Sequence, residues 1–567
     1  MQSLKFKQLL ILSNSSNSAN QFKFSENLNL ITAKDNSVGK STLVKLLFWG
    51  LGCEPTLDTT WSSLDCKTIV DFQIGNNHYS VKRYKNQISL SENESLFIDY
   101  PKITDDYSKK IASILGFKAL LPNRSSGSLE TPPPAYYFLP FYIDQKRSWA
   151  SAWNNFDNLG QFDNWKSTII KYHVGLLTPS HFKLESEKVE KKDCQKEVQV
   201  QIDKINTALE VVENFIPQLS QTTIDNVKFE KLTNEIRVDL RELQETQEII
   251  LNELTQLNGE RVYLEQQQII TEKIIFELDS DYKFTIENIN GDEVECPLCG
   301  VIHDNSIINR TSIMSDKSQA ENQLETISRE LGKVNNKLSN NQIALNQVRL
   351  QIKTINDKYI IYDEDKKIEF VDIIESIAGN SIKQNVITEK TSKLVKIDNL
   401  IGEIKAINKE QKGLLTKEEI DTIYNSFNTI FSRYVELLDA EAVNISEIQS
   451  PLDYNKIIKE GGAAEGSRAI LAYYMTIFTL VERFGNEVKS CLVIDTPNQQ
   501  EQSHSNYAKI VDILTSGISK NTQVILCAME NEHLDSYKEN ATIITLDKNK
   551  LLDKAKYEEI KKHFEKE

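Results

Sequence analysis

Apolar positions change their spacing twice along the chain, and these changes divide it into regions. Residues 1–181 alternate short apolar runs with polar, turn-rich stretches, a pattern typical of an α/β fold. Charged helical sequence follows, and the α/β pattern returns at 416–567. An apolar helix is predicted over residues 41–51, and buried strands at 491–494 and 524–527. We therefore predict two α/β segments that are separated by long helices.

The intervening helices carry a heptad repeat. The ascending limb, 182–279, has apolar residues at steps of three and four from Ile236 to Leu264, if Gln247 and Arg261 fill two polar gaps. In the descending limb, 311–415, the steps run unbroken from Leu324 to Ile355, and only Asn341 is polar. Such repeats form a coiled-coil seam, in which one buried Asn can fix the register. One face of a helix bundle is the alternative, but heptads on both sides of a single turn favour an antiparallel arm.

The turn between the limbs, 280–310, contains a pair of cysteines. Asn290 and Gly291 give a hairpin signal, and the sequence Cys-Pro-Leu-Cys follows at Cys296–Cys299. Two thiolates supply half of a tetrahedral zinc site, and His303 is a further candidate ligand. The alternative is a pair of cysteines in an ordinary turn. At the tip of a coiled coil we favour a Zn²⁺ site that two chains share through Cys296 and Cys299.

Composition narrows the function classes. The chain has 567 residues, of which 26% are charged, and a formal net charge of -16. An acidic surface repels nucleic acid, so any DNA contact requires a local basic patch and depends strongly on salt. Seven cysteines, scattered except for the one close pair, fit a cytoplasmic protein. No apolar run approaches the ~20 residues of a membrane span, so we expect no membrane partner.

The segment 34–42 reads Lys-Asp-Asn-Ser-Val-Gly-Lys-Ser-Thr and opens the first predicted helix after a strand-like run, which is the context of a phosphate-binding loop. Gly39 would let the backbone approach phosphate, and successive N–H groups would cradle it. Lys40 would reach the β- and γ-phosphates, and Ser41 would hold Mg²⁺. The first glycine of the usual motif is replaced by Lys34.

Two predicted strands end in polar residues that suit the same site. The run 491–494 leads into Asp495, whose carboxylate would hold Mg²⁺ through water beside Ser41. The run 141–143 leads into Gln145, whose amide would bind Mg²⁺ or the attacking water. Each pattern is weak alone, because buried strands often end in such residues, but together they strengthen the prediction of a nucleotide site.

A glycine-rich turn lies about 30 residues before the strand that leads into Asp495. It spans 461–468 and precedes an apolar helix at 469–480. A helix N-terminus of this kind is an anion cradle, although a plain helix start with Ser467 near the cap is the alternative.

Along the chain the motifs follow the order phosphate-binding loop, Gln145, coiled coil, Cys296–Cys299 turn, coiled coil, glycine-rich turn and Asp495 strand. This order resembles that of the SMC-like zinc-hook ATPases, such as SbcC and its eukaryotic double-strand-break repair relatives, and the resemblance covers essentially the whole chain. The resemblance implies an α/β ABC-type ATPase head assembled from the N- and C-terminal segments, split by a long antiparallel coiled coil with a zinc-hook apex. Two heads would sandwich two ATP molecules with Mg²⁺. Residues implied at the cis site are Asn36, Ser37, Val38, Gly39, Lys40, Ser41, Thr42, Gln145 and Asp495, and those acting in trans are Gly466, Ser467 and Arg468.

The chain departs from this family at two catalytic positions. The family has a Glu after the Walker B Asp, where this chain has Thr496. It has a His after the next strand, where this chain has Met529, and the nearest histidine is His533. Positioned acid–base groups contribute ~10²–10⁴-fold, so we predict an ATPase that hydrolyses slowly. Glu501 or Glu530 would be the substitute base.

The short arms and the stretches Asp-Thr-Pro-Asn-Gln-Gln and Phe-Tyr-Ile-Asp-Gln most resemble the SMC-like subunit of bacterial Lamassu anti-phage systems. This resemblance implies an ATP-binding DNA sensor that dimerises through its heads and hook and controls an effector subunit, a nuclease, beside a small accessory subunit. An ATP-hydrolysing repair ATPase with a partner nuclease is disfavoured by Thr496. An ATP-independent scaffold is disfavoured by the intact sequence at 39–42.

The family places double-stranded DNA on the head and the root of the coiled coil. Basic residues gather there in this sequence, and each alone is more often an ordinary solvated charge. The candidate DNA-binding residues are Lys109, Lys110, Lys146 and Arg147, with Lys118 and Arg124 nearby.

Overall fold

Two compact units make up the chain. The computed structural model describes residues 2–35, 38–58, 61, 64–215, 226–287, 293–295, 302–304, 307–356, 361–363, 366–368, 370–440, 443–457, 463–498, 502–519, 521–547 and 551–565. Residues 1–189 and 406–567 form the first unit, here called the head, and residues 190–405 form the second, here called the arm. The head therefore combines the two ends of the sequence, which the sequence analysis divided at 181 and 416.

A five-stranded parallel sheet forms one part of the head. Its strand order is β10 (Tyr142–Ile143), β15 (Leu492–Asp495), β16 (Val524–Met529), β3 (Leu28–Ala33) and β17 (Ala541–Thr545). Every neighbouring pair is parallel. β15 is buried throughout and β16 nearly so, which agrees with their unbroken apolar runs. Because β3 lies between β16 and β17, the sheet exists only when both ends of the chain contribute.

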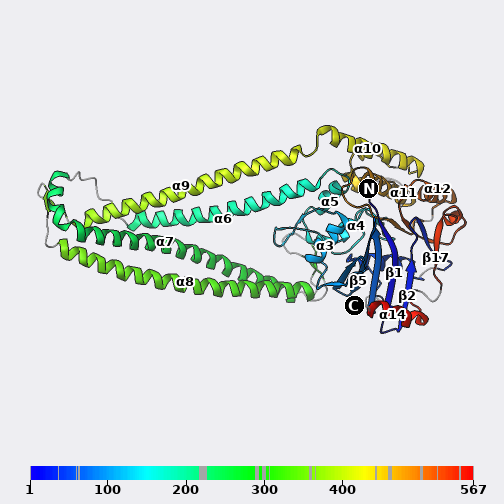
Figure 1. Ribbon diagram of the computed structural model, residues 1–567, viewed down its shortest axis with the longest axis horizontal. Helices are drawn as coiled ribbons and strands as arrows, with labels where there is room; N and C mark the ends of the chain where they lie inside the picture. Colours follow the sequence, from blue (N-terminus) through cyan, green and yellow to red (C-terminus); the bar gives the residue numbers. More distant parts are fainter. Residues whose placement is uncertain are drawn as a thin grey trace. The chain divides into compact units, whose positions relative to one another are not determined.

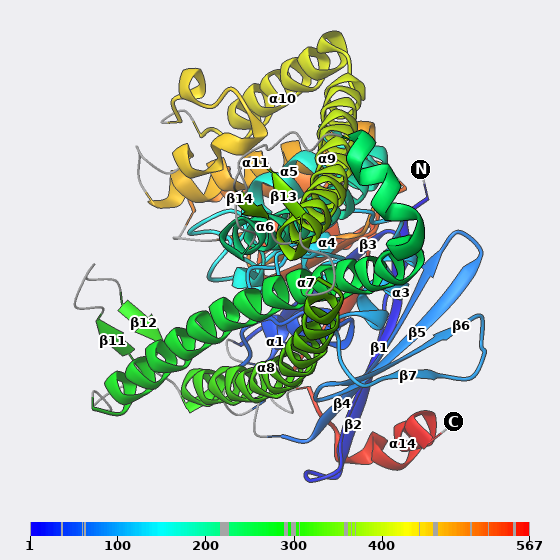
Figure 2. The ribbon, with the colours of Figure 1, turned by 90° about the vertical axis from the view of Figure 1, so that its left-hand side faces the viewer.

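A six-stranded antiparallel sheet forms the other part of the head. Its order is β2 (Ser18–Lys23), β1 (Leu4–Ser13), β4 (Cys66–Ile74), β5 (Asn77–Tyr84), β6 (Gln87–Glu92) and β7 (Ile98–Tyr100). The C-terminal helix α14 (Tyr557–Glu565) lies along β1 and β2 (Figure 2). Its residue Ile560 packs on Leu10 and Leu12. The end of the chain is thus anchored on the strands that begin it.

Helix α1 (Lys40–Gly50) packs against strands of both sheets. Its residues Leu43, Leu47 and Phe48 are fully buried. The Phe48 ring meets Tyr142 at 4.5 Å and Phe138 at 5.3 Å between centroids. Aromatic contacts of this kind add to the free energy of burial, so the C-terminal half of α1 is held firmly against the head core.

Shorter elements complete the head. They are α3 (Asp106–Leu115), β8 (Leu121–Pro122), β9 (Leu129–Glu130), α4 (Ala135–Phe138), η1 (Leu159–Gln161), α5 (Trp165–His173), α10 (Lys417–Leu437), η2 (Ile445–Glu447), η3 (Pro451–Lys456), α11 (Ala463–Phe484), α12 (His504–Ser516), η4 (Glu532–Leu534), α13 (Asp535–Lys538) and η5 (Lys554–Lys556). The apolar segment 135–138, which precedes the predicted strand at 141–143, forms the helix α4 and not a strand. Pro134 at its N-cap already has a helical backbone, and proline favours a helix start.

Two helix pairs form the arm. Helices α6 (Pro179–Phe215) and α9 (Phe370–Gly413) lie side by side (Figure 1). They pack through Val198, Ile202 and Ile397. The first turns of α6, up to Val189, belong to the head. Helices α7 (Asn226–Glu287) and α8 (Ile307–Asn356) pack along the predicted heptad positions. None of the described helices combines the length and the apolar stretch that crossing a membrane requires.

Both pairs keep one antiparallel register. The Lys393 ammonium donates to Gln201 across α6 and α9 at 2.9 Å, and the Asn341 amide donates to Glu253 across α7 and α8 at 2.9 Å. Gln201 and Glu253 are 52 residues apart, as are Asn341 and Lys393. The ascending and descending limbs therefore contain the same number of residues between these two contacts. Equal numbers are expected when the two limbs pair in an antiparallel arm.

Two small hairpins also belong to the arm. They are β11 (Glu293–Glu295) with β12 (Ile302–Asp304), and β13 (Ile361–Asp363) with β14 (Lys366–Ile368). The first lies in the predicted apex, but Cys296 and Cys299 lie outside the described residues. The zinc hook thus stays a prediction.

Candidate nucleotide site

The parallel sheet brings the predicted site residues to one edge. In such a sheet, ligands bind at the carboxyl ends of the strands. β3 leads into the loop before α1, β15 ends at Asp495, β10 is followed by Gln145 two residues later, and β16 ends at Met529. Residues that are more than 450 positions apart in sequence thereby come into contact.

The loop before α1 requires glycine at position 39. Gly39 has φ +106°, a conformation that residues with a side chain rarely adopt. A Cβ built there would lie 2.8 Å from Cγ of the buried Leu551. The helix therefore starts without a bulky side chain near its free N–H groups, as an anion cradle needs. Val38 is buried, whereas Asn36 and Ser37 lie outside the described residues.

Lys40 is largely buried, and among the described side chains no carboxylate forms an ion pair with it. Its ammonium donates to Met529 Sδ at 3.0 Å and to the Asp35 carbonyl at 3.4 Å. Burial lowers the pKa of Lys40, while Asp495 acts in the opposite direction. A buried cation that has only weak acceptors suits the approach of an anion such as phosphate.

Three oxygen-bearing side chains converge beside this lysine. The Ser41 hydroxyl lies 2.9 Å from Gln145 Oε1 and 3.0 Å from Asp495 Oδ1. A hydroxyl carries one hydrogen, so it satisfies only one of these acceptors at a time. Asp495 Oδ2 is also buried and has no hydrogen-bond partner. Ser41, Gln145 and Asp495 together therefore present more acceptor oxygens than there are hydrogen-bond donors to satisfy them.

This arrangement fits Mg²⁺. Neighbouring oxygens around an octahedral Mg²⁺ lie about 3 Å apart, because the metal–oxygen distance is about 2.1 Å. The separations of Ser41 Oγ from Gln145 Oε1 and Asp495 Oδ1 match that spacing. Burial raises the pKa of Asp495 to about 6, although the hydrogen bond from Ser41 lowers it. A divalent cation would neutralise this buried carboxylate.

Asp144 positions the Gln145 loop, a role that the sequence analysis did not assign. It is buried, and its carboxylate accepts from the backbone N–H groups of Lys146 and Arg147 at 3.0 Å each. It also faces the ammonium of Lys45 on α1 at 3.5 Å. In the sequence, the feature that could have identified Asp144 is its position as an acidic residue between a buried strand and Gln145.

The position after Asp495 carries no catalytic carboxylate. Thr496 has φ +56°, which is a strained conformation for a β-branched residue. Its hydroxyl donates to Asp495 Oδ1 at 3.0 Å, and its N–H donates to the Cys527 carbonyl at 2.9 Å. Of the two suggested substitute bases, Glu530 is exposed, and Glu501 lies outside the described residues.

The predicted signature residues lie inside a helix. We expected the helix to begin at 469, but α11 begins at Ala463, so Gly466 and Ser467 belong to its first turns. Ala463, Ala464 and Glu465 tolerate the helix well, which explains the earlier start. Arg468 is buried and donates to Gln502 Oε1 at 2.6 Å and to the Asp439 carbonyl at 2.7 Å. Its guanidinium is engaged within its own head, and the trans role of these residues stays a prediction.

The candidate DNA residues differ in their availability. Lys109 and Lys146 are exposed, and Lys109 forms a long, solvent-exposed ion pair of 4.0 Å with Asp106. Lys110 pairs with Glu92 at 3.2 Å, and Arg147 forms an ion pair with Asp157.

Comparisons with known proteins agree with the sequence resemblance. The chain is 23% identical over 558 residues to Lamassu protein LmuB of Bacillus cereus (strain VD014), covering 94% of this chain and 92% of that protein. It is 24% identical over 493 residues to Lamassu protein LmuB of another Bacillus strain, NIO-1130, covering 83% of each. No family model matches the chain.

Solved structures show weaker likeness. The Smc head domain with a coiled coil and joint from Pyrococcus yayanosii gives a TM-score of 0.41 at 13% identity, over 99% of this chain and 100% of that chain. The recombination mediator RecF bound to ATP gives 0.27 at 10% identity, over 98% and 99%. These scores are too low to carry an argument. The sequence relationship does carry one: over most of its length, the chain is a homologue of proteins named Lamassu protein LmuB.

Proposed function

We propose that the chain is an SMC-like ATP-binding DNA sensor of an anti-phage defence system, which controls a partner effector such as a nuclease. The observation that carries the nucleotide part is the convergence of Ser41, Gln145 and Asp495 beside Lys40. The names of its homologues support the defence role. The absence of a carboxylate at Thr496 supports a sensor that stays bound to ATP rather than a fast motor.

Each residue has a defined task in this proposal. The Gly39 loop and Lys40 bind the phosphates, and Ser41, Gln145 and Asp495 hold Mg²⁺. When it is bound, Mg²⁺ neutralises charge on the phosphates and orients them. Trp149 donates from Nε1 to the Asp495 carbonyl at 3.1 Å and so fixes the end of β15. Thr496 accepts no proton from water at neutral pH, so hydrolysis lacks its usual base.

Nucleotide binding and turnover test the proposal. Wild-type protein should bind ATP with Mg²⁺ and turn it over well below ~1 s⁻¹. Lys40→Ala should abolish binding, whereas Lys23→Ala, which changes an exposed lysine, should not. Thr496→Glu should accelerate turnover by about 10²-fold or more, because it supplies the missing base. Rapid wild-type turnover would instead favour the repair ATPase.

DNA binding has its own test. The two exposed candidates should be reversed, giving Lys109→Glu with Lys146→Glu. The ion pair of Lys109 with Asp106 is solvent-exposed and therefore weak, so it leaves the ammonium available to a phosphate. If both contact phosphate, the slope of log K against log salt on duplex DNA should become shallower by about 2. The control reverses Lys554 and Lys562, which are exposed on the C-terminal tail. An unchanged slope would exclude this surface as the DNA site.

We also propose that Cys296 and Cys299 of two chains share one zinc ion as a hook. A shared Cys₄ site requires about half a zinc per chain. Replacement of both cysteines by Ser should remove that half equivalent and weaken dimerisation in the absence of ATP. Zinc that persists unchanged after the replacement would rule out the hook.

A further inference from the structure

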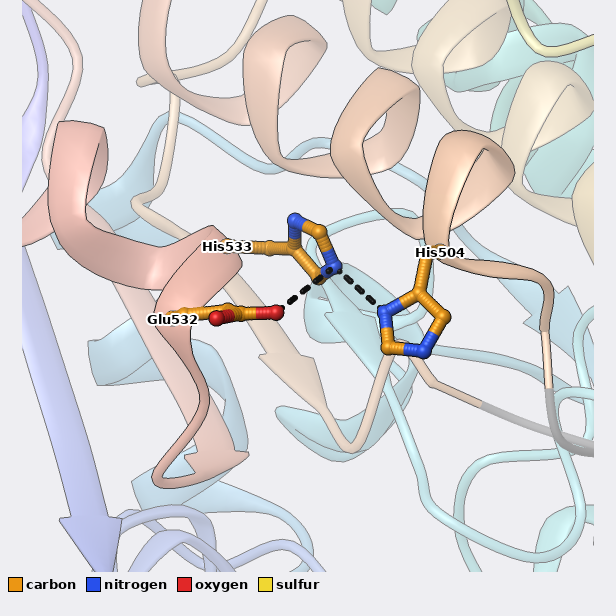
Figure 3. Close-up of side chains that lie close together, drawn as sticks. All are labelled: His504, Glu532 and His533. Carbon is orange, nitrogen blue, oxygen red and sulfur yellow. Dashed lines mark hydrogen bonds and ion pairs between the residues drawn. The ribbon is translucent and has the colours of Figure 1, made fainter.

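A second cluster of metal-ligand side chains lies in the head, outside the predicted nucleotide residues. His504 Nδ1 and His533 Nε2 are 2.8 Å apart, and His533 Nε2 is 4.0 Å from Glu532 Oε1 (Figure 3). One ligand atom of each residue lies within 4.8 Å of the other two. Within the described part of the chain, no other group of His, Cys, Asp and Glu side chains meets this criterion. No local ligand spacing marks His504 in the sequence, because His533 lies 29 residues further along the chain.

Capped helix starts present the three side chains. Ser503 caps α12 by accepting from the Asn506 N–H at 3.3 Å, which places His504 in the first helical turn. Asn531 caps η4 by accepting from the His533 N–H at 2.9 Å. N-caps fix the backbone of the residues that follow them. The ligands therefore stand on ordered backbone, and the Tyr507 ring lies 6.1 Å from the His533 ring and packs edge-on against it.

The chemistry of the three groups suits a borderline transition metal. Two imidazole nitrogens and one carboxylate, with a fourth position open, are a common ligand set for zinc. Tetrahedral ligands at about 2.0–2.1 Å stand about 3.3 Å apart, so the two nitrogens need to separate by only about 0.5 Å. His504 and Glu532 are exposed, which leaves their side chains room to turn. A hydrogen bond between two neutral imidazoles would account for the histidines, but it gives no role to the carboxylate.

The cluster also joins two segments that start at the nucleotide site. The segment that leads to His504 begins after Asp495, and the segment that contains His533 begins after Met529, whose sulfur contacts Lys40. We propose that His504, Glu532 and His533 bind a zinc-class divalent ion, which ties these two segments together. This proposal stands on the side-chain geometry alone and does not require that the protein bind ATP.

Cobalt titration of the full-length chain tests the site. Cys296→Ser and Cys299→Ser are introduced first, so that no hook thiolate contributes. One Co²⁺ per chain should then bind with the visible bands of four-coordinate cobalt and without thiolate charge-transfer bands, and Zn²⁺ should displace it. His504→Ala should weaken binding by at least about 100-fold, beyond the roughly 10–100-fold typical of a lost outer-shell contact. Glu532→Gln should weaken it less.

His563→Ala provides the matched control, because His563 is an exposed histidine on α14 and should leave the affinity unchanged. Absence of cobalt or zinc binding at 1:1 stoichiometry would overturn the proposal, as would binding that is insensitive to His504→Ala. The latter result would leave the 2.8 Å contact as a hydrogen bond only.

Hydrogen exchange tests the tie between the segments. Zinc should slow amide exchange in both 502–516 and 530–538 of the protein with intact histidines, and in neither segment of the His504→Ala variant. Protection of one segment alone would contradict a metal that bridges them. Nucleotide is left out of this experiment, so its result is separate from that of the ATP-binding test.

Discussion

Individual residues of the candidate nucleotide site carry conformational and electrostatic costs. Thr496 and Gly39 both have positive φ, and Asp495 is fully buried with one oxygen unpartnered. Strain and unmatched polar groups of this kind persist where function requires them. The Mg²⁺ and phosphate that we propose for this site would compensate for the charge, so their removal should be measurable as a change in stability.

Asp495→Asn should stabilise the metal-free protein at neutral pH. The pKa of Asp495 is about 6 in the folded chain against an ordinary value of 3.8, so the folded state binds more protons between these values. The wild-type free energy of unfolding should therefore fall as pH rises from about 4 to 6, by about 3 kcal/mol. Asn does not titrate and should remove this loss.

Magnesium should reverse that effect. It should raise the melting temperature of the wild type above about pH 6, where Asp495 is ionised, and leave the Asn variant unchanged. Thermal melts over this pH range, with and without Mg²⁺, provide the measurement. Parallel profiles for the two proteins would show that Asp495 is not the titrating ligand.

Gly39→Ala should destabilise the head and prevent nucleotide binding. The left-handed backbone costs a residue with a side chain roughly 1–2 kcal/mol, and its Cβ would press on Leu551. Leu551→Ala in the same chain should relieve the steric part only. Denaturant melts of the two single variants and the double variant separate these contributions, and full rescue by Leu551→Ala would contradict a backbone origin.

At the scale of elements, the arm contains a polar residue at a core position. Gln247 is completely buried on α7, and neither of its amide atoms has a hydrogen-bond partner. Asn341 on α8 is less enclosed and donates to Glu253. Polar side chains with and without hydrogen-bond partners thus lie along the same seam as Leu254, Val334 and Leu338.

Gln247→Leu should stabilise the arm. An unsatisfied buried polar group costs about 1–3 kcal/mol, and leucine suits a coiled-coil core. Hydrogen exchange in α7 and α8 should slow in this variant. The control, Gln266→Leu, alters an exposed position of the same helix and should not change protection. Faster exchange after Gln247→Leu would indicate that the amide has a structural role.

At the scale of the whole molecule, the head is one unit made from two distant segments. Residues 1–189 supply β3 and β10 of the parallel sheet, and residues 406–567 supply β15, β16 and β17. The segments also approach each other where α6 and α9 join the head, since Lys188 donates to Gln411 at 3.3 Å.

A head without the arm should therefore fold. Residues 1–189 joined to 406–567 by a short Gly/Ser linker should melt cooperatively and bind ATP, because neighbouring helices lie only about 10 Å apart. Either segment expressed alone should lack a cooperative transition, since β3 would have no partner strands. Cooperative folding of residues 1–189 alone would refute the shared core.

Sequence alone determined the features that local chemistry encodes. Three features are readable in this way, because each depends on neighbouring residues or a fixed period: the glycine and lysine at the start of α1, the apolar strand that ends at Asp495, and the heptads of α7 and α8. The homologues agree with the family resemblance that these motifs indicated.

Tertiary structure alone decided which distant side chains meet. Parallel strand pairing brings Gln145 and Asp495 to Ser41, and it brings the segment after β16 to α12, so that His533 meets His504. Strand order arises from the burial of whole elements rather than from neighbouring residues. Local patterns therefore single out Gln145 and Asp495 as strand-end residues, but the contact between His504 and His533 has no local signal.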